Sequence, residues 1–338
     1  MLNGKHWKLP YYLGLTKLPT APLYVNVEPA ANCNLRCGLC SSRRRDDSNA
    51  QIDMALFKDI VADAKRAGVV NISLWLAGEP LMNPRVAEMV AYVESAGLVS
   101  GLHTNGTLLT ERRAKGLLDA NLSQLSISFD GVDRETYEQM RRGANYDKTV
   151  ANIRRFLELK ATQGNGRPNT IVQTMVPFSP EMRSDDGWIH YPEAPLALRE
   201  LFAGLPVDEF RILLPHNWAG EIEGEGLLPQ GRAYSPCQHL WTGLSIAWDG
   251  RVHGCCTDLN GTLIRGDVRH GDSLAQIWNN ATSQRLRRLH HQGRYREIPL
   301  CRNCSQVWQN EHPLRAELRG HPLLQPAIAL RRRLKGQQ

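Results

Sequence analysis

The sequence lacks any apolar run of about 18 residues, the length that a membrane-spanning helix requires, so no part of it is expected to cross a membrane. Its first ten residues are basic and lack the apolar core of a secretion signal, which leaves the cytoplasm as the expected compartment. No segment repeats at a fixed period. The net charge of +7 is spread thinly apart from short arginine runs, which gives a nucleic-acid partner little support.

Cysteine, by contrast, is plentiful for such a compartment. Eight cysteines in a cytoplasmic chain are more commonly metal ligands than disulfides. Cys33, Cys37 and Cys40 form a C-x3-C-x2-C run directly after an apolar strand-like stretch. Three thiolates on one loop can hold three irons of a 4Fe-4S cluster and leave the fourth iron open to a substrate or cofactor. A zinc knuckle that lacks its fourth ligand, or three unrelated buried thiols, are the alternatives.

The middle of the chain has the pattern of an α/β protein. Residues 23–214 alternate short β-branched runs with longer amphipathic segments, which predicts strand-helix units and a parallel sheet. Six such units favour an open, partial (β/α)6 TIM-like barrel over a closed eightfold one. The expected strands are 23–27, 71–76, 99–103, 124–129, 170–176 and 209–213, and the expected helices include 54–67, 84–96, 111–120 and 148–160.

The unusual short motifs fall in the loops that follow the first four strands. The first loop carries the cysteine triplet, and the next three carry Ala77-Gly78-Glu79-Pro80, Thr104-Asn105-Gly106 and Asp130-Gly131. Each of the later three is also an ordinary turn sequence. In a parallel α/β sheet, however, these loops gather at the carboxyl ends of the strands, where ligands bind. The candidate site is therefore expected at that edge.

The sequence changes character after residue 214, where Pro215 and a glycine-rich stretch indicate a connector. A β-hairpin is predicted at 244–255, turning at Asp249-Gly250, and a helix at 273–283, capped by Ser273. We therefore expect an N-terminal extension (1–22), a barrel (23–214), a linker (215–236), a small α+β cysteine-rich domain (237–310) and a basic tail (311–338).

These motifs together resemble those of radical S-adenosylmethionine (SAM) enzymes. The barrel part of the resemblance lies in the cysteine triplet, Ala77-Gly78-Glu79-Pro80 and Ser128-Phe129-Asp130-Gly131. Trp248-Asp249-Gly250, Cys255-Cys256 and Cys301-x2-Cys304 are similar to the SPASM/twitch extension of that superfamily. The resemblance covers about residues 21–310. It implies that SAM chelates the open iron and is cleaved by one electron, and that the 5'-deoxyadenosyl radical formed abstracts hydrogen from carbon.

The resemblance also implies roles for single residues. Glu79 matches the acidic residue that receives the methionine amino group of SAM, and Gly78 belongs to the same motif, in which Ala77 replaces the first glycine. Arg141 matches an arginine that pairs with the methionine carboxylate. Four residues stand where the family contacts the ribose and that carboxylate, with ordinary capping as the alternative: Thr104, Asn105, Ser128 and Asp130.

A second cysteine set consists of Cys237, Cys255, Cys301 and Cys304. Four thiolates suffice to close an auxiliary 4Fe-4S cluster, which suits electron transfer or structure, or to hold a structural zinc ion. The set is similar to the shorter twitch arrangement with one auxiliary cluster, because the extra cysteines expected for two clusters are absent. Cys256 is left over. It could replace Cys255 as a ligand, fill a core, or donate a hydrogen atom to a carbon radical, and similar cysteine pairs occur in radical epimerases of the superfamily.

We therefore predict a radical SAM enzyme that epimerises a small polar substrate, with Cys256 as the hydrogen donor and a flavodoxin- or ferredoxin-type reducing partner. Dehydrogenation of a secondary alcohol, with the auxiliary cluster as electron acceptor, is an alternative, because the auxiliary spacing resembles that of an aminocyclitol dehydrogenase of antibiotic biosynthesis. Radical dehydration or decarboxylation and peptide maturation or epimerisation are others. A zinc-stabilised nucleic-acid-binding protein is the non-enzyme alternative.

The substrate class is inferred mainly from what precedes the cysteine triplet. Only 32 residues stand before Cys33, too few for the leader-binding domain of many peptide-modifying relatives, which favours a sugar, aminocyclitol or nucleoside from natural-product biosynthesis. The segment 179–195 interrupts the strand-helix pattern and could cover the site, although a plain surface loop is the alternative. Its polar and aromatic residues are Trp188, His190, Tyr191 and Glu193. In the connector, Glu221, Glu223 and Glu225 could contact an amine of the substrate, and simple exposure to solvent is the alternative.

Overall fold

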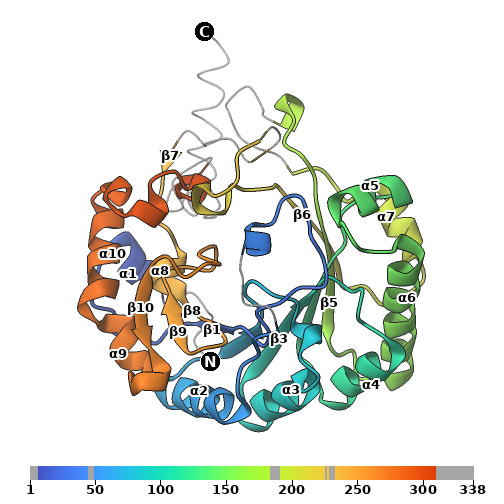
Figure 1. Ribbon diagram of the computed structural model, residues 1–338, viewed down its shortest axis with the longest axis horizontal. Coiled ribbons are helices and arrows are strands. Elements are labelled where there is room, and N and C mark those ends of the chain that lie inside the picture. The colour runs from blue at the N-terminus through green and yellow to red at the C-terminus, as the bar shows by residue number, and fades with distance from the viewer. Residues whose placement is uncertain (1–6, 45–48, 183–190, 225–226, 228–232, 310–338) are drawn as a thin grey trace, which may run out of the picture.

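The computed structural model describes residues 7–44, 49–182, 191–224, 227 and 233–309. These residues form a mixed α/β fold around one nine-stranded sheet with the order β10-β9-β8-β1-β2-β3-β4-β5-β6 (Figure 1). A two-stranded sheet pairs β7 (Ala233–Tyr234) with β11 (Trp308–Gln309). None of the described helices is both long and apolar enough to span a membrane.

Six strands of the large sheet pair in sequence order and in parallel. Their helices lie along the outside of the curved sheet (Figure 1), which confirms the predicted open barrel. The strands are β1 (Tyr24–Val27), β2 (Asn71–Leu74), β3 (Val99–Thr104), β4 (Gln124–Ser128), β5 (Asn169–Met175) and β6 (Glu209–Leu213). The helices are α2 (Met54–Ala67), α3 (Val86–Ser95), α4 (Glu111–Asp119), α5 (Arg134–Met140), α6 (Tyr146–Gln163) and α7 (Leu196–Leu201).

The ends of the helices follow from local chemistry. In α2, the Asp53 carboxylate accepts hydrogen bonds from the backbone N–H groups of Ala55 and Leu56, and Gly68 ends the helix in the left-handed region with φ of 86°. The short helices α5 and α7 were not predicted, because neither is long enough to show a full amphipathic repeat. The helix α5 matters for the site, since it follows the Asp130 loop.

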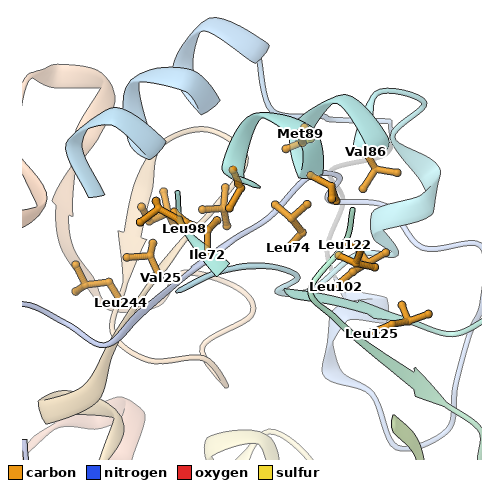
Figure 2. Close-up of a cluster of buried hydrophobic side chains, with 14 of the residues drawn as sticks. Val25, Ile72, Leu74, Val86, Met89, Leu98, Leu102, Leu122, Leu125 and Leu244 are labelled. Atoms are coloured by element: carbon orange, nitrogen blue, oxygen red, sulfur yellow. The ribbon is translucent and has the colours of Figure 1, made fainter. Parts of the chain in front are cut away.

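The hydrophobic core lies between the sheet and its outer helices. Figure 2 shows Val25, Ile72 and Leu74 from the strands and Val86 and Met89 from α3, all of them buried. Ile72 and Leu74 alternate with half-buried residues on β2, the pattern of a strand with one face in the core. Burying a side chain of this size contributes about 1.5–3 kcal/mol, so this layer holds the strand ends in place.

The C-terminal part of the chain extends the same sheet on the other side of β1. The strand β8 (Gly243–Ile246) pairs in parallel with β1, and β9 (Arg251–His253) and β10 (Ile264–Asp267) follow antiparallel. The predicted hairpin is found as β8 and β9, but its pairing with β1 was not predicted, because hairpin periodicity carries no information about a distant neighbour. Gly243 permits the pairing, since a Cβ there would lie 2.3 Å from the Tyr24 ring. The proposed division of the chain into domains stays a prediction.

One predicted helix is two helices. Residues 273–283 were expected as a single segment, but α9 (Leu274–Asn279) ends before Asn280, and α10 (Ala281–His291) begins after it. Asn280 is extended, with ψ of 172°, and its side chain accepts a hydrogen bond from the Ser283 backbone N–H, so it caps the second helix. The predicted cap at Ser273 is found on α9.

The first described residues pack against the C-terminal part. In α1 (Lys8–Tyr12), the Tyr11 hydroxyl lies 2.6 Å from Ser235 Oγ and donates to the carbonyl of Pro236. The Tyr11 ring also meets Trp241 of α8 (His239–Thr242) edge to face. The first described residues therefore pack against the segment that carries Cys237.

Candidate active site

One cavity of about 670 Å³ receives the loops that follow β1 to β4 and the C-terminal cysteine segments. All eight cysteines line it, so the two sets that lie far apart in the sequence face the same space. The other predicted site residues line it as well: Gly78, Glu79, Thr104, Asn105, Ser128, Asp130 and Arg141.

The cysteine triplet lies on the loop after β1, which is fastened to the end of α5. The backbone N–H groups of Arg36 and Gly38 donate to the carbonyls of Arg142 and Met140. The Leu35 backbone N–H lies 3.5 Å from Cys33 Sγ and can donate to it. Burial raises the pKa of Cys33 to about 12, so this thiol gives up its proton only when a metal takes its place.

Glu79 is the central acid of the site and is 3% exposed. Its Oε1 accepts from the Leu81 N–H at 3.1 Å and the Thr104 hydroxyl at 2.6 Å, and its Oε2 accepts from the Asn105 N–H at 2.8 Å. Burial raises the pKa of Glu79 despite these donors. Glu79 forms no ion pair among the described residues, and the Arg141 charge only partly opposes the effect of burial on its pKa, so this carboxylate suits an ammonium group such as the amino group of SAM.

Gly78 brings the Glu79 loop against the start of the cysteine loop. A Cβ at Gly78 would lie 2.0 Å from the carbonyl oxygen of Ala30, and the Glu79 backbone N–H donates to the Asn32 carbonyl at 2.9 Å. Only glycine permits this approach. The two motifs are thus held together by backbone contact.

Asn105 connects Glu79 with the cysteine loop. Its side-chain amide lies 3.8 Å from Cys33 Sγ and donates to Asn34 Oδ1 at 3.1 Å, while its oxygen accepts from the N–H and hydroxyl of Thr107. Asn105 therefore positions the first cysteine. Its predicted contact with the ribose or carboxylate of SAM stays a prediction.

Asp130 and Arg141 form a buried ion pair, with Arg141 Nη2 2.5 Å from Asp130 Oδ2. The other oxygen of Asp130 accepts from the Met175 N–H at 2.7 Å. Arg141 Nε has no hydrogen-bond partner in the described part of the chain and is available to an added acceptor. Ser128 Oγ accepts from the Gln173 side chain at 2.9 Å. The predicted pairing of Arg141 with the SAM carboxylate would use the free Nε edge.

The auxiliary cysteines come from three segments. Cys237 precedes α8, Cys255 follows β9, and Cys301 and Cys304 frame a tight turn. His290 links two of these segments, because its Nδ1 accepts from the Cys237 N–H and its Nε2 lies 3.5 Å from Cys301 Sγ. Burial raises the pKa of Cys237 and Cys304 to about 11.

The donor chemistry fits iron-sulfur clusters. Among the described residues, no three His, Cys, Asp or Glu side chains converge on one point as ligands of a single ion. The thiols instead surround the shared cavity, and a cluster needs only one thiolate for each iron that it presents. A cluster held by the triplet would keep one iron free for a ligand, and a cluster held by the second set would keep none.

Cys256 lines the cavity beside Cys255. Burial raises the pKa of the Cys256 thiol well above its usual value, so the sulfur keeps its hydrogen at neutral pH. That state suits a hydrogen-atom donor, but burial raises the pKa of the neighbouring Cys255 as well, so protonation does not set Cys256 apart from the cluster ligands.

The sequence analysis missed Glu28, which is fully buried and joins the two halves of the site. Its carboxylate accepts from the Ala77 N–H at 3.1 Å and the Trp248 N–H at 3.3 Å. The acid thus ties the loop before Glu79 to the turn after β8. A charged residue directly after a buried strand was the available signal.

Two aromatic pairs in the cavity wall were also missed. The Trp75 and His103 rings lie 5.0 Å apart, and the His216 and Trp218 rings 4.6 Å apart. Trp218 Nε1 donates to the Leu39 carbonyl at 2.8 Å, which places this pair over the cysteine loop. Trp75, His216 and Trp218 follow strand ends, so the expectation that ligand-binding residues lie at the carboxyl ends of parallel strands applied to them as well.

The predicted covering segment is only partly described. Tyr191 lines the cavity and is 56% exposed, and Glu193 pairs with Arg199 at the surface. Trp188 and His190 lie outside the described residues, as does Glu225. Glu221 accepts from the Asn260 side chain, and Glu223 is exposed.

An open α/β barrel with a three-cysteine loop after its first strand and a second set of four cysteines is typical of a radical SAM enzyme with an auxiliary-cluster domain. The chain belongs to that superfamily: residues 27–178 match the model of the radical SAM superfamily, and residues 237–305 match the SPASM iron-sulfur cluster-binding domain. These domains imply 4Fe-4S clusters and SAM, and enzymes of this family need a reductant. The family assignment favours the enzyme over the zinc-stabilised nucleic-acid-binding alternative.

Among curated relatives, the chain is 28% identical over 154 residues to the tungsten-containing aldehyde ferredoxin oxidoreductase cofactor-modifying protein of Pyrococcus furiosus, covering 45% of this chain and 43% of that protein. It is 31% identical over 175 residues to dTDP-4-amino-4,6-dideoxy-D-glucose ammonia-lyase of Streptomyces venezuelae, covering 47% and 36%. The match thus spans less than half of each relative.

Two solved structures share the fold over most of the chain. BtrN, in complex with AdoMet and 2-DOIA, superposes with a TM-score of 0.58 at 17% identity, covering 87% of this chain and 97% of BtrN. SuiB of Streptococcus suis, bound to its precursor peptide SuiA, superposes with a TM-score of 0.62 at 15% identity, covering 90% and 73%.

Proposed function

We propose that this protein is a radical SAM epimerase that acts on a small polar substrate, with Cys256 as the hydrogen donor. The observation that carries the proposal is that Cys256, which the two ligand sets do not need, lines the same cavity as Cys33, Cys37 and Cys40. We assign Cys237, Cys255, Cys301 and Cys304 as ligands of the auxiliary cluster.

The chain's own residues then have separate tasks. Glu79 holds the amino group of SAM, and Arg141 offers its free Nε edge to the carboxylate. When bound, the cluster and SAM supply the 5'-deoxyadenosyl radical that removes a hydrogen atom from a substrate carbon. The buried cavity wall keeps water away from the resulting carbon radical.

Cys256 returns a hydrogen atom from the opposite face. The S–H bond of Cys256 breaks, a C–H bond forms, and the stereocentre is inverted. The sulfur radical left on Cys256 takes up one electron and one proton before the next turnover, and a flavodoxin- or ferredoxin-type protein supplies the electron. Each turnover therefore consumes one SAM and two electrons.

The cavity supports a compact substrate. Its volume of about 670 Å³ has to hold both clusters and SAM as well, which leaves room only for a compact substrate. The Trp75–His103 and His216–Trp218 pairs offer flat faces and ring nitrogens, which suit a sugar or aminocyclitol. One relative is named for an amino sugar, dTDP-4-amino-4,6-dideoxy-D-glucose, and the BtrN structure contains the ligand 2-DOIA. A peptide, as in SuiB, is the alternative substrate class.

Dehydrogenation is the second candidate reaction, because the auxiliary cysteines line the same cavity as Cys256. An electron would then leave the substrate radical for the auxiliary cluster and a proton would leave for a base, giving a ketone. The two candidates differ in what becomes of Cys256 and of the substrate hydrogens.

The test compares wild-type protein with C256S, which keeps the size of the side chain but replaces a weak S–H bond by a strong O–H bond. Both are reconstituted with iron and sulfide, reduced, and incubated with SAM and either 2-DOIA or dTDP-4-amino-4,6-dideoxy-D-glucose. We expect 5'-deoxyadenosine from both proteins but inverted product from the wild type alone, with a carbon radical visible by electron paramagnetic resonance (EPR) in C256S. Inversion by C256S at the normal rate would eliminate the proposed donor.

A further inference from the structure

Two buried arginines lie behind the auxiliary cysteines without an acidic partner. Arg265 on β10 is 2% exposed, and Arg287 on α10 is fully buried. Their hydrogen bonds go to neutral oxygens: Arg265 Nε donates to Ser283 Oγ, and Arg287 donates to the carbonyls of Leu240 and Thr16. Burying a charge costs several kcal/mol unless an opposite charge offsets it. The described chain shows two cations here and no anion paired with them.

Three nitrogens of these guanidinium groups have no hydrogen-bond partner among the residues that the structure describes. They are Arg265 Nη1, Arg265 Nη2 and Arg287 Nη2. Both groups lie against the Trp278 ring, at 5.6 Å and 4.3 Å from its centroid, so the two positive charges share one wall. Unsatisfied buried donors of this kind indicate a missing acceptor.

Both guanidinium groups lie behind the wall of the cavity. Arg265 Nε donates to Ser283 on α10, and the same helix carries Leu286 and His290, which line the cavity. Arg287 donates to the carbonyl of Leu240, which lines the cavity too. The Arg265 charge opposes the rise in the pKa of the Cys237 thiol that burial causes.

The nearest buried acid in the preceding loop does not serve as the counter-charge. Asp258 is fully buried, but its oxygens accept from the N–H groups of Gly254, Thr262 and Leu263 and from the Thr262 hydroxyl. These donors satisfy Asp258 without a guanidinium. Among the described residues, the two guanidinium charges therefore have no acidic partner, and the cavity on the other side of the wall is lined by the thiols of the auxiliary set.

We propose that Arg265, with Arg287 behind it, is the counter-charge of the auxiliary 4Fe-4S cluster and raises the reduction potential of that cluster. A cluster held by four thiolates is an anion, and reduction adds a further negative charge. A buried cation nearby stabilises the reduced form more than the oxidised form. Arg265 is a positioning residue, because it acts through the cluster and does not touch the substrate.

The inference rests on the four auxiliary ligands of the proposed function and is independent of the role of Cys256. The experiment is an EPR redox titration of reconstituted holoprotein without substrate. The cluster signal that SAM does not alter belongs to the auxiliary cluster. The variants are R265Q, which removes the charge, and R265K, which keeps it. R285Q is the matched control, because Arg285 lies on the exposed side of α10.

We expect R265Q to shift the ratio of oxidised to reduced auxiliary cluster at least tenfold toward the oxidised form, which for one electron is a potential lower by 59 mV. R265K should recover most of the shift, and R285Q should match the wild type. Loss of the auxiliary cluster from R265Q with its retention in R265K would also support a charge requirement.

Three results would overturn the proposal. A ratio of oxidised to reduced auxiliary cluster in R265Q within twofold of the wild-type ratio would show that the charge does not act on the cluster. An equal shift in R285Q would show that any charge on α10 has the same effect. Loss of the cluster from both R265Q and R265K would assign Arg265 a purely structural role. Wild-type protein without an auxiliary cluster would instead reject the ligand assignment of the proposed function.

Discussion

Replacing Glu79 by glutamine should separate SAM binding from folding. Glu79 is buried, and its two oxygens accept three hydrogen bonds, from Leu81, Thr104 and Asn105. A glutamine can keep its oxygen toward Leu81 and Thr104 but then turns its NH2 toward the Asn105 N–H. The lost bond costs about 1–3 kcal/mol, and removal of a poorly solvated charge offsets part of that cost.

The effect on the affinity for SAM is larger, because no other group replaces the lost negative charge opposite the amino group of SAM. A hydrogen bond between an ammonium and a carboxylate contributes about 1.5–3 kcal/mol, so E79Q should weaken SAM binding about 10- to 150-fold. The melting temperature should change little. The assay is anaerobic equilibrium dialysis of SAM against reconstituted protein of verified iron content, with a thermal melt of the same sample.

The matched control is E88Q, which removes a surface glutamate paired with Arg85 on α3. We expect E88Q to bind SAM as the wild type does, since an exposed ion pair contributes little. An E79Q protein that binds SAM within twofold of the wild-type affinity would refute the assignment of Glu79. A large drop in melting temperature would instead mean that Glu79 serves mainly to hold the loops together.

Three further predictions concern the frame of the site. G78A should fail to bind SAM and should melt at a lower temperature, because its Cβ would meet the Ala30 carbonyl at 2.0 Å, whereas G224A in the exposed connector, with no atom within 4 Å, should behave as the wild type in both assays. E28Q should lower the free energy of unfolding by about 1–3 kcal/mol in denaturant titrations, because one of the Ala77 and Trp248 N–H groups loses its acceptor; no loss would show that the link is dispensable. Burial and Arg211 lower the pKa of His103 from 6.5 to about 4. Between pH 6.5 and pH 4, the unfolded chain therefore binds a proton at this residue and the folded chain does not. Stability should therefore fall as the pH drops from 6.5 to 4, by about 3 kcal/mol from this residue, and the fall should be smaller in H103Q; an equal fall in H103Q would contradict the assignment.

Much of the barrel could be predicted because its signals are local. The strands from β1 to β6 are short β-branched runs, and their carboxyl ends carry Cys33, Glu79, Asn105 and Asp130 in loops that a parallel sheet must bring together. The pairing of β8 with β1 could not be predicted in the same way, because it depends on Gly243 fitting beside Tyr24, a contact between residues 219 positions apart (243 − 24).

Some site residues could not be found because their roles depend on distant partners. Glu28 gains its role from Trp248 across the sheet, and Arg265 stands out only because its donors are buried and unpaired. Asn280 interrupts a helix that hydrophobic periodicity alone continues. Sequence patterns place residues at strand ends, whereas the contacts across the cavity require the folded chain.

The product formed in deuterated water tests the proposed reaction most directly. Reconstituted wild-type protein, reduced and supplied with SAM and an accepted substrate, should give inverted product that carries one solvent deuterium for each 5'-deoxyadenosine formed, because the Cys256 thiol exchanges with water. A product that lacks two hydrogen atoms and contains no solvent deuterium would contradict epimerisation and assign the enzyme to dehydrogenation.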